Sequence, residues 1–383
     1  MKKHAISMMS GTSLDGIDII YGDIEGSGLS TKLSVHHTKT YAYDHKLMEK
    51  IKKAMSQSES TSKLLCSLNV ELAQAYSKCV FAFCEEFDID MTDIDFIANH
   101  GQTIYHISED DEKDIRSSLQ LGDGSVLAQL TKIQVVSNFR MADIASGGHG
   151  APLVPYAHYV LFRDQYKDRI LQNIGGIANA TYLMKDRQLE DVLAFDNGPG
   201  NMMIDYACQT LLGKDYDDGG HIASSGQVIQ AMFDDVMAHP YFKKKPPKST
   251  GREVFGQDYC DQLLKTYNDE DPKDIITTLT HITAKAIGQS YMDFIKEDLS
   301  KTEMIVSGGG ARNKTLINLI KLYAKTDQVY VMEDFGYDSD YFEALAFMIL
   351  ANQTLLGQTS NVPHATGAKE DVVLGQISPV RGG

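Results

Sequence analysis

Residues 5–24 read AISMMSGTSLDGIDIIYGDI, and this stretch places a glycine-containing loop between two apolar segments. Residues 5–9 and 17–24 are predicted strands, because each is a short, mainly apolar run bounded by turn-forming residues. Residues 32–43, KLSVHHTKTYAY, predict a third strand. A strand, a tight loop and two further strands in immediate succession indicate an antiparallel meander.

The same order of elements begins again at residue 169. Residues 169–174, RILQNI, predict a strand that leads into the glycine loop GGIAN, and residues 180–183 and 192–195 predict two more strands. After each meander, segments with helical spacing of apolar residues alternate with single short strands. The predicted helices are residues 47–55, 65–83, 125–130, 202–212, 227–237, 260–267, 273–297, 312–324 and 341–356, and the predicted strands are 94–98, 133–136, 304–306 and 328–332.

This repetition predicts an α/β protein with two domains of similar topology and mixed sheets flanking a cleft. The 383 residues also favour two domains, at roughly 100–200 residues each. We place the domains at residues 1–160 and 161–383, and the C-terminal segment is a candidate to return to the first domain.

The charge balance restricts the partners. The chain has 36 Lys and Arg residues against 52 Asp and Glu residues, for a net charge of −16. An acidic protein lacks the basic surface that nucleic-acid binding or docking on anionic lipid requires. We expect no nucleic acid and no membrane as partner, whereas a small anionic ligand stays compatible with this charge.

The ends and the cysteines favour a cytoplasmic protein. The apolar run near the N-terminus stops after Met9, too early for a signal peptide, and no run of about 18 apolar residues predicts a membrane span. The five cysteines are odd in number and form no Cys-x-x-Cys motif. This pattern favours reduced thiols in the core over a metal or redox site.

Four glycine-rich segments each follow a predicted strand: residues 10–18, 147–152, 173–179 and 307–313. Glycine lets the backbone approach a ligand closely, and successive N–H groups in such turns bind anions. None of the four is a P-loop of the form GxxxxGK[ST], and none gives a complete GxGxxG after a strand. Two such turns in equivalent places of two repeated halves favour a nucleotide held between duplicated domains.

Seven motifs, in order along residues 9–375, together resemble those of the anhydro-N-acetylmuramic acid kinases. They are MSGTSLDGID, NHGQTIYH, FRMADIASGGHGAPLVP, NIGGIAN, FDNGPGNMMID, STGRE and SGGGARN. The resemblance implies two ribonuclease-H-like domains of the actin/hexokinase/Hsp70-like ATPase superfamily. It also implies a cytoplasmic bacterial homodimer that uses ATP and Mg²⁺. Such an enzyme adds water across the 1,6-anhydro ring of anhydro-N-acetylmuramic acid and phosphorylates O6, in cell-wall recycling.

The resemblance assigns three segments to ATP. The first phosphate loop would be Gly11, Thr12, Ser13, Leu14, Asp15, Gly16, Ile17 and Asp18. Asn173, Gly175 and Gly176 would form the second phosphate loop, and Gly308, Gly309 and Gly310 would hold the adenosine. Asp15 and Asp18 are candidate Mg²⁺ ligands through water, with an Asx-turn as the alternative.

Asp196 in FDNGPGN is the candidate general base, which would deprotonate the water that attacks C1. A carboxylate at the end of a buried strand can be partly desolvated and so gain basicity. The alternative is a helix N-cap. Glu343 in DYFEALAF matches an acidic position of the family near the sugar and would orient the water or a hydroxyl; alternatively it is a surface residue of an amphipathic helix.

On the sugar side, the resemblance suggests His100, Gln102 and Thr103 in NHGQT, which we predict as a polar loop after a buried strand. Arg140 and Asp143 in FRMAD form a second polar group. Arg140 would either meet the lactyl carboxylate of the sugar or pair with Asp143. His149 stands where the family pattern leads us to expect Gln, and the lysine-rich residues 243–248 are predicted as a solvated loop.

Two alternatives to the anhydro sugar kinase remain open from the sequence. One is a kinase of the same fold for another sugar, and the other is a non-catalytic sugar sensor. The candidate base and all the glycine loops are retained, which speaks against the sensor.

Overall fold

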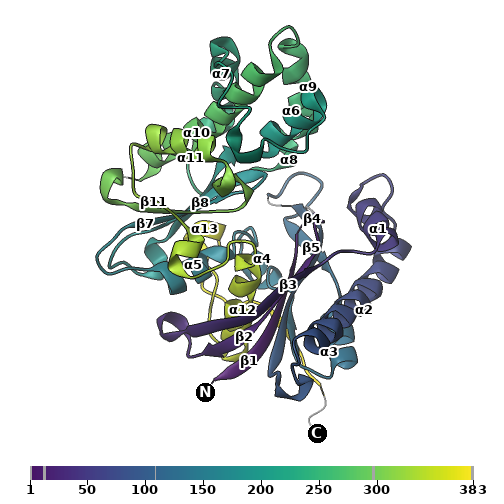
Figure 1. Ribbon diagram of the computed structural model, residues 1–383. Coiled ribbons are helices and arrows are strands. Elements are labelled where there is room, and N and C mark those ends of the chain that lie inside the picture. Colours follow the sequence, from purple (N-terminus) through teal and green to yellow (C-terminus); the bar gives the residue numbers. More distant parts are fainter. Residues whose placement is uncertain (1, 12–13, 108, 296–297, 381–383) are drawn as a thin grey trace. The chain divides into compact units, whose positions relative to one another are not determined.

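The computed structural model describes residues 2–11, 14–107, 109–295 and 298–380 (Figure 1). The chain divides into two compact units, of which the first comprises Met1–Leu161 and Tyr341–Gly383 and the second Phe162–Asp340. The C-terminal segment therefore groups with the N-terminal unit. Each unit is built around its own β-sheet.

The first sheet has the strand order β12-β6-β4-β1-β2-β3, with β5 paired to β4. Strands β1, β2 and β3 form an antiparallel meander, whereas β4 runs parallel to β1 and β6 runs parallel to β4. The bounds are β1 Lys3–Ser10, β2 Ile17–Glu25, β3 Lys32–Tyr41, β4 Phe96–Ile107, β5 Ser117–Leu121, β6 Val135–Ser137 and β12 Gln376–Ser378.

Helices cover both faces of this sheet (Figure 1). On one face, α1 (His45–Met55), α2 (Ser62–Glu86) and α3 (Gly124–Thr131) share a core with the side chains of Ile6 and Met8. On the other, α12 (Phe342–Leu355) packs on β1, β2 and β4, and nearly all of its residues are buried. Three shorter helices complete the unit: α4 Met141–Ala145, α5 Val154–Phe162 and α13 Pro363–Thr366.

The second sheet has the order β11-β10-β7-β8-β9. Here β7, β8 and β9 form the antiparallel meander, and β10 runs parallel to both β7 and β11. The bounds are β7 Arg169–Ile174, β8 Ile177–Leu183, β9 Leu193–Pro199, β10 Glu303–Ser307 and β11 Val329–Val331. Both sheets thus place the third, second and first strands of their unit beside the fourth, and a further parallel strand follows the fourth: β6 in the first sheet and β11 in the second. The first sheet has two more strands, β5 and β12.

The second unit has two packed cores. Helices α10 (Pro272–Phe294) and α11 (Lys314–Ala324) pack with the sheet. The N-terminal half of α10 also contacts a group of helices away from the sheet, which are α6 Met202–Leu212, α7 Gln230–Met237, α8 Arg252–Phe255 and α9 Gln257–Thr266 (Figure 1). Helix α10 begins at Pro272 after Asp271, whose carboxylate accepts the N–H of Lys273. An Asp at the N-cap and a proline in the first turn are both typical of a helix N-terminus.

The predicted α/β class and the two repeated meanders are confirmed. The duplicated strand order and the mixed sheets agree with the duplicated fold that the family resemblance implies. The meander strands start within two residues of their predicted positions except β8, which begins at Ile177 and so takes up part of the predicted glycine loop.

Three local predictions are wrong. NHGQT is not a loop but lies inside β4, because β1 and β5 supply hydrogen-bonding partners for its backbone. Strand β9 continues through Asp196 to Pro199, so that Asp196 lies within the strand and Asn201 is the N-cap of α6. The segment at residues 147–152 follows helix α4, not a strand.

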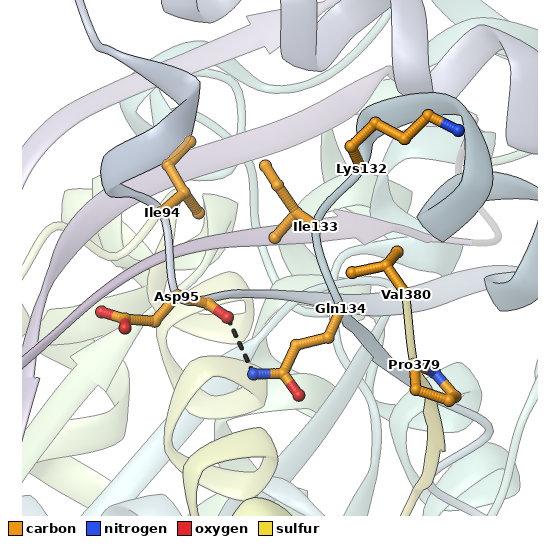
Figure 2. Close-up of a pocket in the computed structure, with 7 residues that line it drawn as sticks. All are labelled: Ile94, Asp95, Lys132, Ile133, Gln134, Pro379 and Val380. Carbon is orange, nitrogen blue, oxygen red and sulfur yellow. Dashed lines mark hydrogen bonds between the residues drawn. The ribbon is translucent and has the colours of Figure 1, made fainter. Parts of the chain in front are cut away.

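Other features lie away from the motifs. A shallow hollow of about 310 Å³ is lined by side chains around the chain segment before the C-terminus, among them Lys132, Gln134 and Val380 (Figure 2). None of its lining residues belongs to the seven motifs. No helix within the described residues is long and apolar enough to cross a bilayer. All five cysteines are unpaired, and Cys66 is exposed, contrary to the prediction of core thiols.

Candidate active site

The first glycine loop connects β1 to β2 and rests on a buried hydrogen-bond network. The hydroxyls of Ser10 and Tyr76 are 2.9 Å apart, and the hydroxyl of Tyr43 donates to Oε1 of Gln102 over 2.9 Å. The amide of Gln102 in turn donates to the carbonyl oxygen of Gly11 over 3.0 Å. The network ties the start of the loop to strand β4 and helix α2. Of the predicted phosphate-binding residues, Thr12 and Ser13 lie outside the described residues.

Gln102 and Thr103 differ in their access to a ligand. Gln102 is fully buried, and its amide also contacts the carbonyl of Thr103. Its position fits support of the glycine loop better than the predicted contact with a sugar. Thr103 is half-buried, and its hydroxyl accepts a long hydrogen bond of 3.4 Å from Gln120.

Two residues of the loop, Leu14 and Gly16, have restricted local geometry. Leu14 is buried and has a φ of 61°, and its N–H donates to the carbonyl of Gly11 over 3.4 Å. A Cβ at Gly16 would lie 2.6 Å from Cγ2 of Thr40 and 2.9 Å from the carbonyl oxygen of Tyr41. The meander therefore admits only glycine at position 16, where the chain enters β2 through Ile17.

Asp15 and Asp18, the candidate metal ligands, have different environments. Asp15 is exposed, whereas Asp18 is half-buried in β2 and its carboxylate accepts the hydroxyl of Thr40 over 2.6 Å. Mg²⁺ typically uses one or two carboxylates and completes its shell with water and substrate phosphates. One half-buried carboxylate beside the predicted phosphate loop fits this requirement, although no cluster of three or more metal-binding side chains occurs within the described residues.

Arg140 and His100 form a buried polar pair in the first unit. One guanidinium nitrogen of Arg140 donates to the carbonyl of Gly150 over 2.8 Å, and the other lies 2.8 Å from Nε2 of His100. Burial, and then the Arg140 charge, lower the pKa of His100 to about 3. His100 is therefore neutral and accepts from Arg140, which puts its proton on Nδ1. Nε of Arg140 is buried and has no hydrogen-bond partner among the described residues.

Asp143 does not pair with Arg140; it organises the adjacent loop. Its Oδ2 accepts the N–H of Gly150 over 2.8 Å, while Oδ1 accepts from the amide of Asn361 and the hydroxyl of Thr366. Asp143 is fully buried, so these bonds join residues near 150 to the chain after α12. These contacts give Asp143 a structural role in this loop.

Glu343 lies in the first turn of α12, and its charge interacts with Arg140 and Asp18. Desolvation by the surrounding protein raises its pKa, the Arg140 guanidinium opposes this rise, and the Asp18 carboxylate adds to it. Part of the side chain is nevertheless open to solvent. Glu343 is thus exposed, as the surface alternative expects, but α12 is not an amphipathic surface helix, because nearly all of its other residues are buried.

In the second unit, the loop at Gly175 and Gly176 connects β7 to β8 and is fastened to the N-terminus of α6. The carbonyl of Gly175 accepts the N–H of Asn201, and the carbonyl of Gly176 accepts those of Gly200 and Met202. Added Cβ atoms would meet nothing closer than 3.6 Å at either glycine. Steric crowding within the protein does not explain these glycines, whereas close approach of a ligand would.

The third segment, at residues 307–310, packs directly on the second. The hydroxyl of Ser307 lies 3.5 Å from Oδ1 of Asn173. Gly308 has a φ of +77°, and a Cβ there would lie 2.6 Å from the same oxygen of Asn173 and 2.9 Å from the carbonyl oxygen of Ile174. A Cβ at Gly310 would lie 2.3 Å from Cγ2 of Ile174. The ends of β7 and β10 thus bring two of the predicted nucleotide segments together.

The Gly308→Ala substitution is expected to destabilise the protein by about 1–2 kcal/mol, because alanine is strained at positive φ and its Cβ clashes with backbone. The adjacent Gly309→Ala is the matched control, since its Cβ would meet only Nδ2 of Asn201, at 3.6 Å. Urea unfolding of both variants checks this. Equal loss of stability in the two variants would contradict the steric account.

Asp196, in β9, is held by the chain segment at residues 248–250. The backbone N–H of Asp196 donates to the carbonyl of Lys248, and its Oδ2 accepts the N–H of Thr250 over 2.9 Å. Oδ1 has no protein donor among the described residues. Desolvation raises the pKa of Asp196 to about 7, against opposing effects of the Thr250 N–H and the Lys248 charge, and Glu253 adds to the rise. This carboxylate is oriented, has a free oxygen and is basic near neutral pH.

Sequence reasoning missed Lys248, which is only 8 % exposed. Its Nζ lies 4.6 Å from the ring centre of Tyr241 and 5.2 Å from that of Phe294. The prediction of a solvated loop holds for Lys243, Lys244 and Lys245, which are exposed, but is wrong for Lys248. The two prolines before it and STGRE after it gave no sign of burial in a basic run.

The comparisons with known proteins place this geometry in a family. The model of the family "anhydro-N-acetylmuramic acid kinase" matches residues 3–380. This chain belongs to the anhydro-N-acetylmuramic acid kinase family. The proteins of that name from Clostridioides difficile (strain 630) and Francisella tularensis subsp. novicida (strain U112) are 46% and 47% identical to it over 376 residues, 98% of each chain. The one from Bacillus cereus (strain AH187) is 44% identical over 373 residues, 97% of this chain and 98% of its own.

Among solved structures, the chain is similar to the activator of the 2-hydroxyisocaproyl-CoA dehydratase from Clostridium difficile with bound ADPNP. That similarity has a TM-score of 0.43 at 12% identity and covers 91% of this chain and 94% of that one. This member of the anhydro-N-acetylmuramic acid kinase family carries two groups of candidate site residues. The first unit holds the first glycine loop, Arg140 and Glu343, and the second unit holds the other two glycine segments assigned to ATP and Asp196.

Proposed function

We propose that this protein is an ATP-dependent kinase that opens the 1,6-anhydro ring of anhydro-N-acetylmuramic acid with water and phosphorylates O6. The products are N-acetylmuramic acid 6-phosphate and ADP, and the reaction serves peptidoglycan recycling. The observation that carries the proposal is Asp196, an oriented carboxylate with a pKa of about 7 and one free oxygen, in a chain of this family.

ATP is assigned to the three glycine segments. The N–H groups of the first loop, from Gly11 to Asp18, and of the loop at Gly175 and Gly176 would donate hydrogen bonds to phosphate oxygens. The segment from Gly308 to Gly310 would take the adenosine, because glycines let its base lie against the backbone. This assignment explains why Gly175 and Gly176 are open on their Cβ side.

A single general base is enough for all the bond changes of this reaction. Asp196 takes a proton from water, the remaining hydroxide forms a bond to C1, and the C1–O6 bond breaks. O6 then forms a bond to the γ-phosphorus of ATP while the bond to the leaving ADP oxygen breaks. In inverting glycosidases a carboxylic acid protonates the leaving oxygen. Here the phosphoryl group captures that oxygen, so positioning of the two substrates dominates catalysis.

The first unit would hold the sugar. Arg140 is assigned to the lactyl carboxylate, because its buried Nε lacks a partner and planar guanidinium groups bind carboxylates well. Neutral His100 keeps Arg140 in place without adding a competing positive charge. Glu343 is assigned to a sugar hydroxyl or to the attacking water, and Thr103 to the edge of the same site.

The proposal includes Mg²⁺, a homodimer and a cytoplasmic location. Asp18, with Asp15 beside it, would hold the metal through water, and the metal would neutralise charge on the phosphates when bound. The half-buried carboxylate that accepts from Thr40 supports this choice. The dimer and the location rest on resemblance to the family.

The test is incubation with ATP, Mg²⁺ and anhydro-N-acetylmuramic acid, followed by assay of ADP and of the sugar phosphate. We expect both products in a one-to-one ratio, with N-acetylmuramic acid a poorer substrate. Turnover of a different sugar in preference would identify the second kinase, and sugar binding without ADP formation would identify a sensor.

A further inference from the structure

Lys248 is a buried cation next to the candidate base, yet it forms no ion pair with any described residue. Burial lowers its pKa to about 8, while the charges of Asp196 and Asp293 raise it and that of Lys244 lowers it. A buried ammonium without a carboxylate partner is costly unless other interactions compensate. Here the compensation comes from the faces of Tyr241 and Phe294, which lie 4.6 and 5.2 Å from Nζ.

The same segment fixes both the geometry and the charge of Asp196. The Lys248 carbonyl accepts the Asp196 N–H over 3.1 Å, and two residues further along the N–H of Thr250 donates to the carboxylate. The hydroxyl of Tyr241, one of the two rings under the ammonium, donates to the Asp196 carbonyl over 2.9 Å. Three hydrogen bonds therefore hold Asp196 in place, from Thr250 and Tyr241 and to the backbone of Lys248, and none of them joins the Lys248 ammonium to the carboxylate.

We propose that Lys248 is a positioning residue, whose buried positive charge keeps Asp196 ionised and ready to accept a proton from water. This inference rests on the proposed function, because it assumes Asp196 to be the base. A direct ion pair would occupy the carboxylate that water needs. A cation held on two aromatic faces supports the negative charge and leaves Oδ1 free.

The neighbouring charges make the proposal specific. Three groups act on Asp196: the Lys248 ammonium and the Thr250 N–H favour its ionised form, while Glu253 opposes it. Tyr241 stays neutral, because burial holds its pKa far above neutral pH. Lys248→Met and Glu253→Gln should therefore shift the Asp196 titration in opposite directions. Glu253 is exposed, so its substitution should not disturb folding.

The experiment measures the titration of Asp196 without use of activity. The ¹³C NMR signal of its carboxyl carbon is followed against pH in protein with labelled aspartate, and is assigned by its absence in Asp196→Asn. In Lys248→Met the midpoint should rise by about one pH unit or more, the range for removal of a nearby opposite charge. It should fall in Glu253→Gln, and stay close to wild type in Lys248→Arg and in the exposed control Lys245→Met.

Kinetics supply the second readout. In Lys248→Met the acid limb of the pH profile of kcat/KM should move to higher pH by the same amount, with activity largely restored above that limb. A merely structural role would lower activity at every pH. An unshifted midpoint in Lys248→Met, or shifts of the same sign in Lys248→Met and Glu253→Gln, would overturn the proposal. If the wild type fails to turn over the sugar while the NMR shifts appear, the proposed function fails and the charge coupling stands.

Discussion

Asp196→Asn is expected to lower kcat by about 10²–10⁴-fold, the usual contribution of a positioned general base. Asparagine has the same shape, and its side-chain oxygen can still accept the Thr250 N–H. ATP affinity should therefore stay within about twofold of wild type, which equilibrium binding checks. Near-normal turnover would remove Asp196 as the base, and a parallel loss of ATP binding would indicate a damaged loop.

The same variant has a pH-dependent effect on stability. The pKa of Asp196 is raised from 3.8 to about 7, so the folded state binds its proton more tightly than the unfolded state. The corresponding stabilisation is complete below about pH 4 and is lost as the pH rises through 7. Asp196→Asn should therefore gain stability relative to wild type between pH 5 and pH 8. Urea unfolding at these two values measures it, and an unchanged difference would contradict the raised pKa.

Arg140→Met has the second largest expected effect, a rise of about 10–100-fold in KM for anhydro-N-acetylmuramic acid. The loss corresponds to hydrogen bonds from a charged group, worth about 1.5–3 kcal/mol. The control is a substrate, the corresponding anhydro sugar without its lactyl group, whose already high KM should barely change in the variant.

The two sugars separate the two interpretations of Arg140. If KM rises equally for both, then Arg140 acts by holding His100 and the Gly150 carbonyl in place, and the assignment to the lactyl carboxylate is wrong. If only the lactyl-bearing sugar is affected, the carboxylate is its ligand.

Much of the fold could be predicted from the sequence because local signals agree with the tertiary structure. A glycine loop after an apolar strand occurs once in each half of the chain, and both halves fold as the same three-stranded meander. Strand β4 was predicted too short because polar NHGQT resembles a loop. The side chains of Asn99, His100 and Gln102 are buried all the same, and His100 bonds to Arg140 and Gln102 to the carbonyl of Gly11.

The sequence identified which residues belong to the candidate site better than it identified what each of them does. The motifs identified Asp196 and Arg140, but whether Arg140 pairs with Asp143 depends on Asn361 and Thr366, which are more than 200 residues away. Lys248 was hidden for a similar reason. A basic run predicts solvent exposure, and only the packing of Tyr241 and Phe294 decides which of its lysines is buried.

The central claim, that one reaction couples water addition at C1 to phosphoryl transfer onto O6, is tested most directly in water labelled with ¹⁸O. A single turnover with ATP, Mg²⁺ and anhydro-N-acetylmuramic acid should give sugar 6-phosphate with one ¹⁸O at C1 and none in its phosphoryl group. Unlabelled product kept in the same water for the same time corrects for exchange at C1. A product whose C1 oxygen is unlabelled, or label in released phosphate without any sugar phosphate, would contradict the claim.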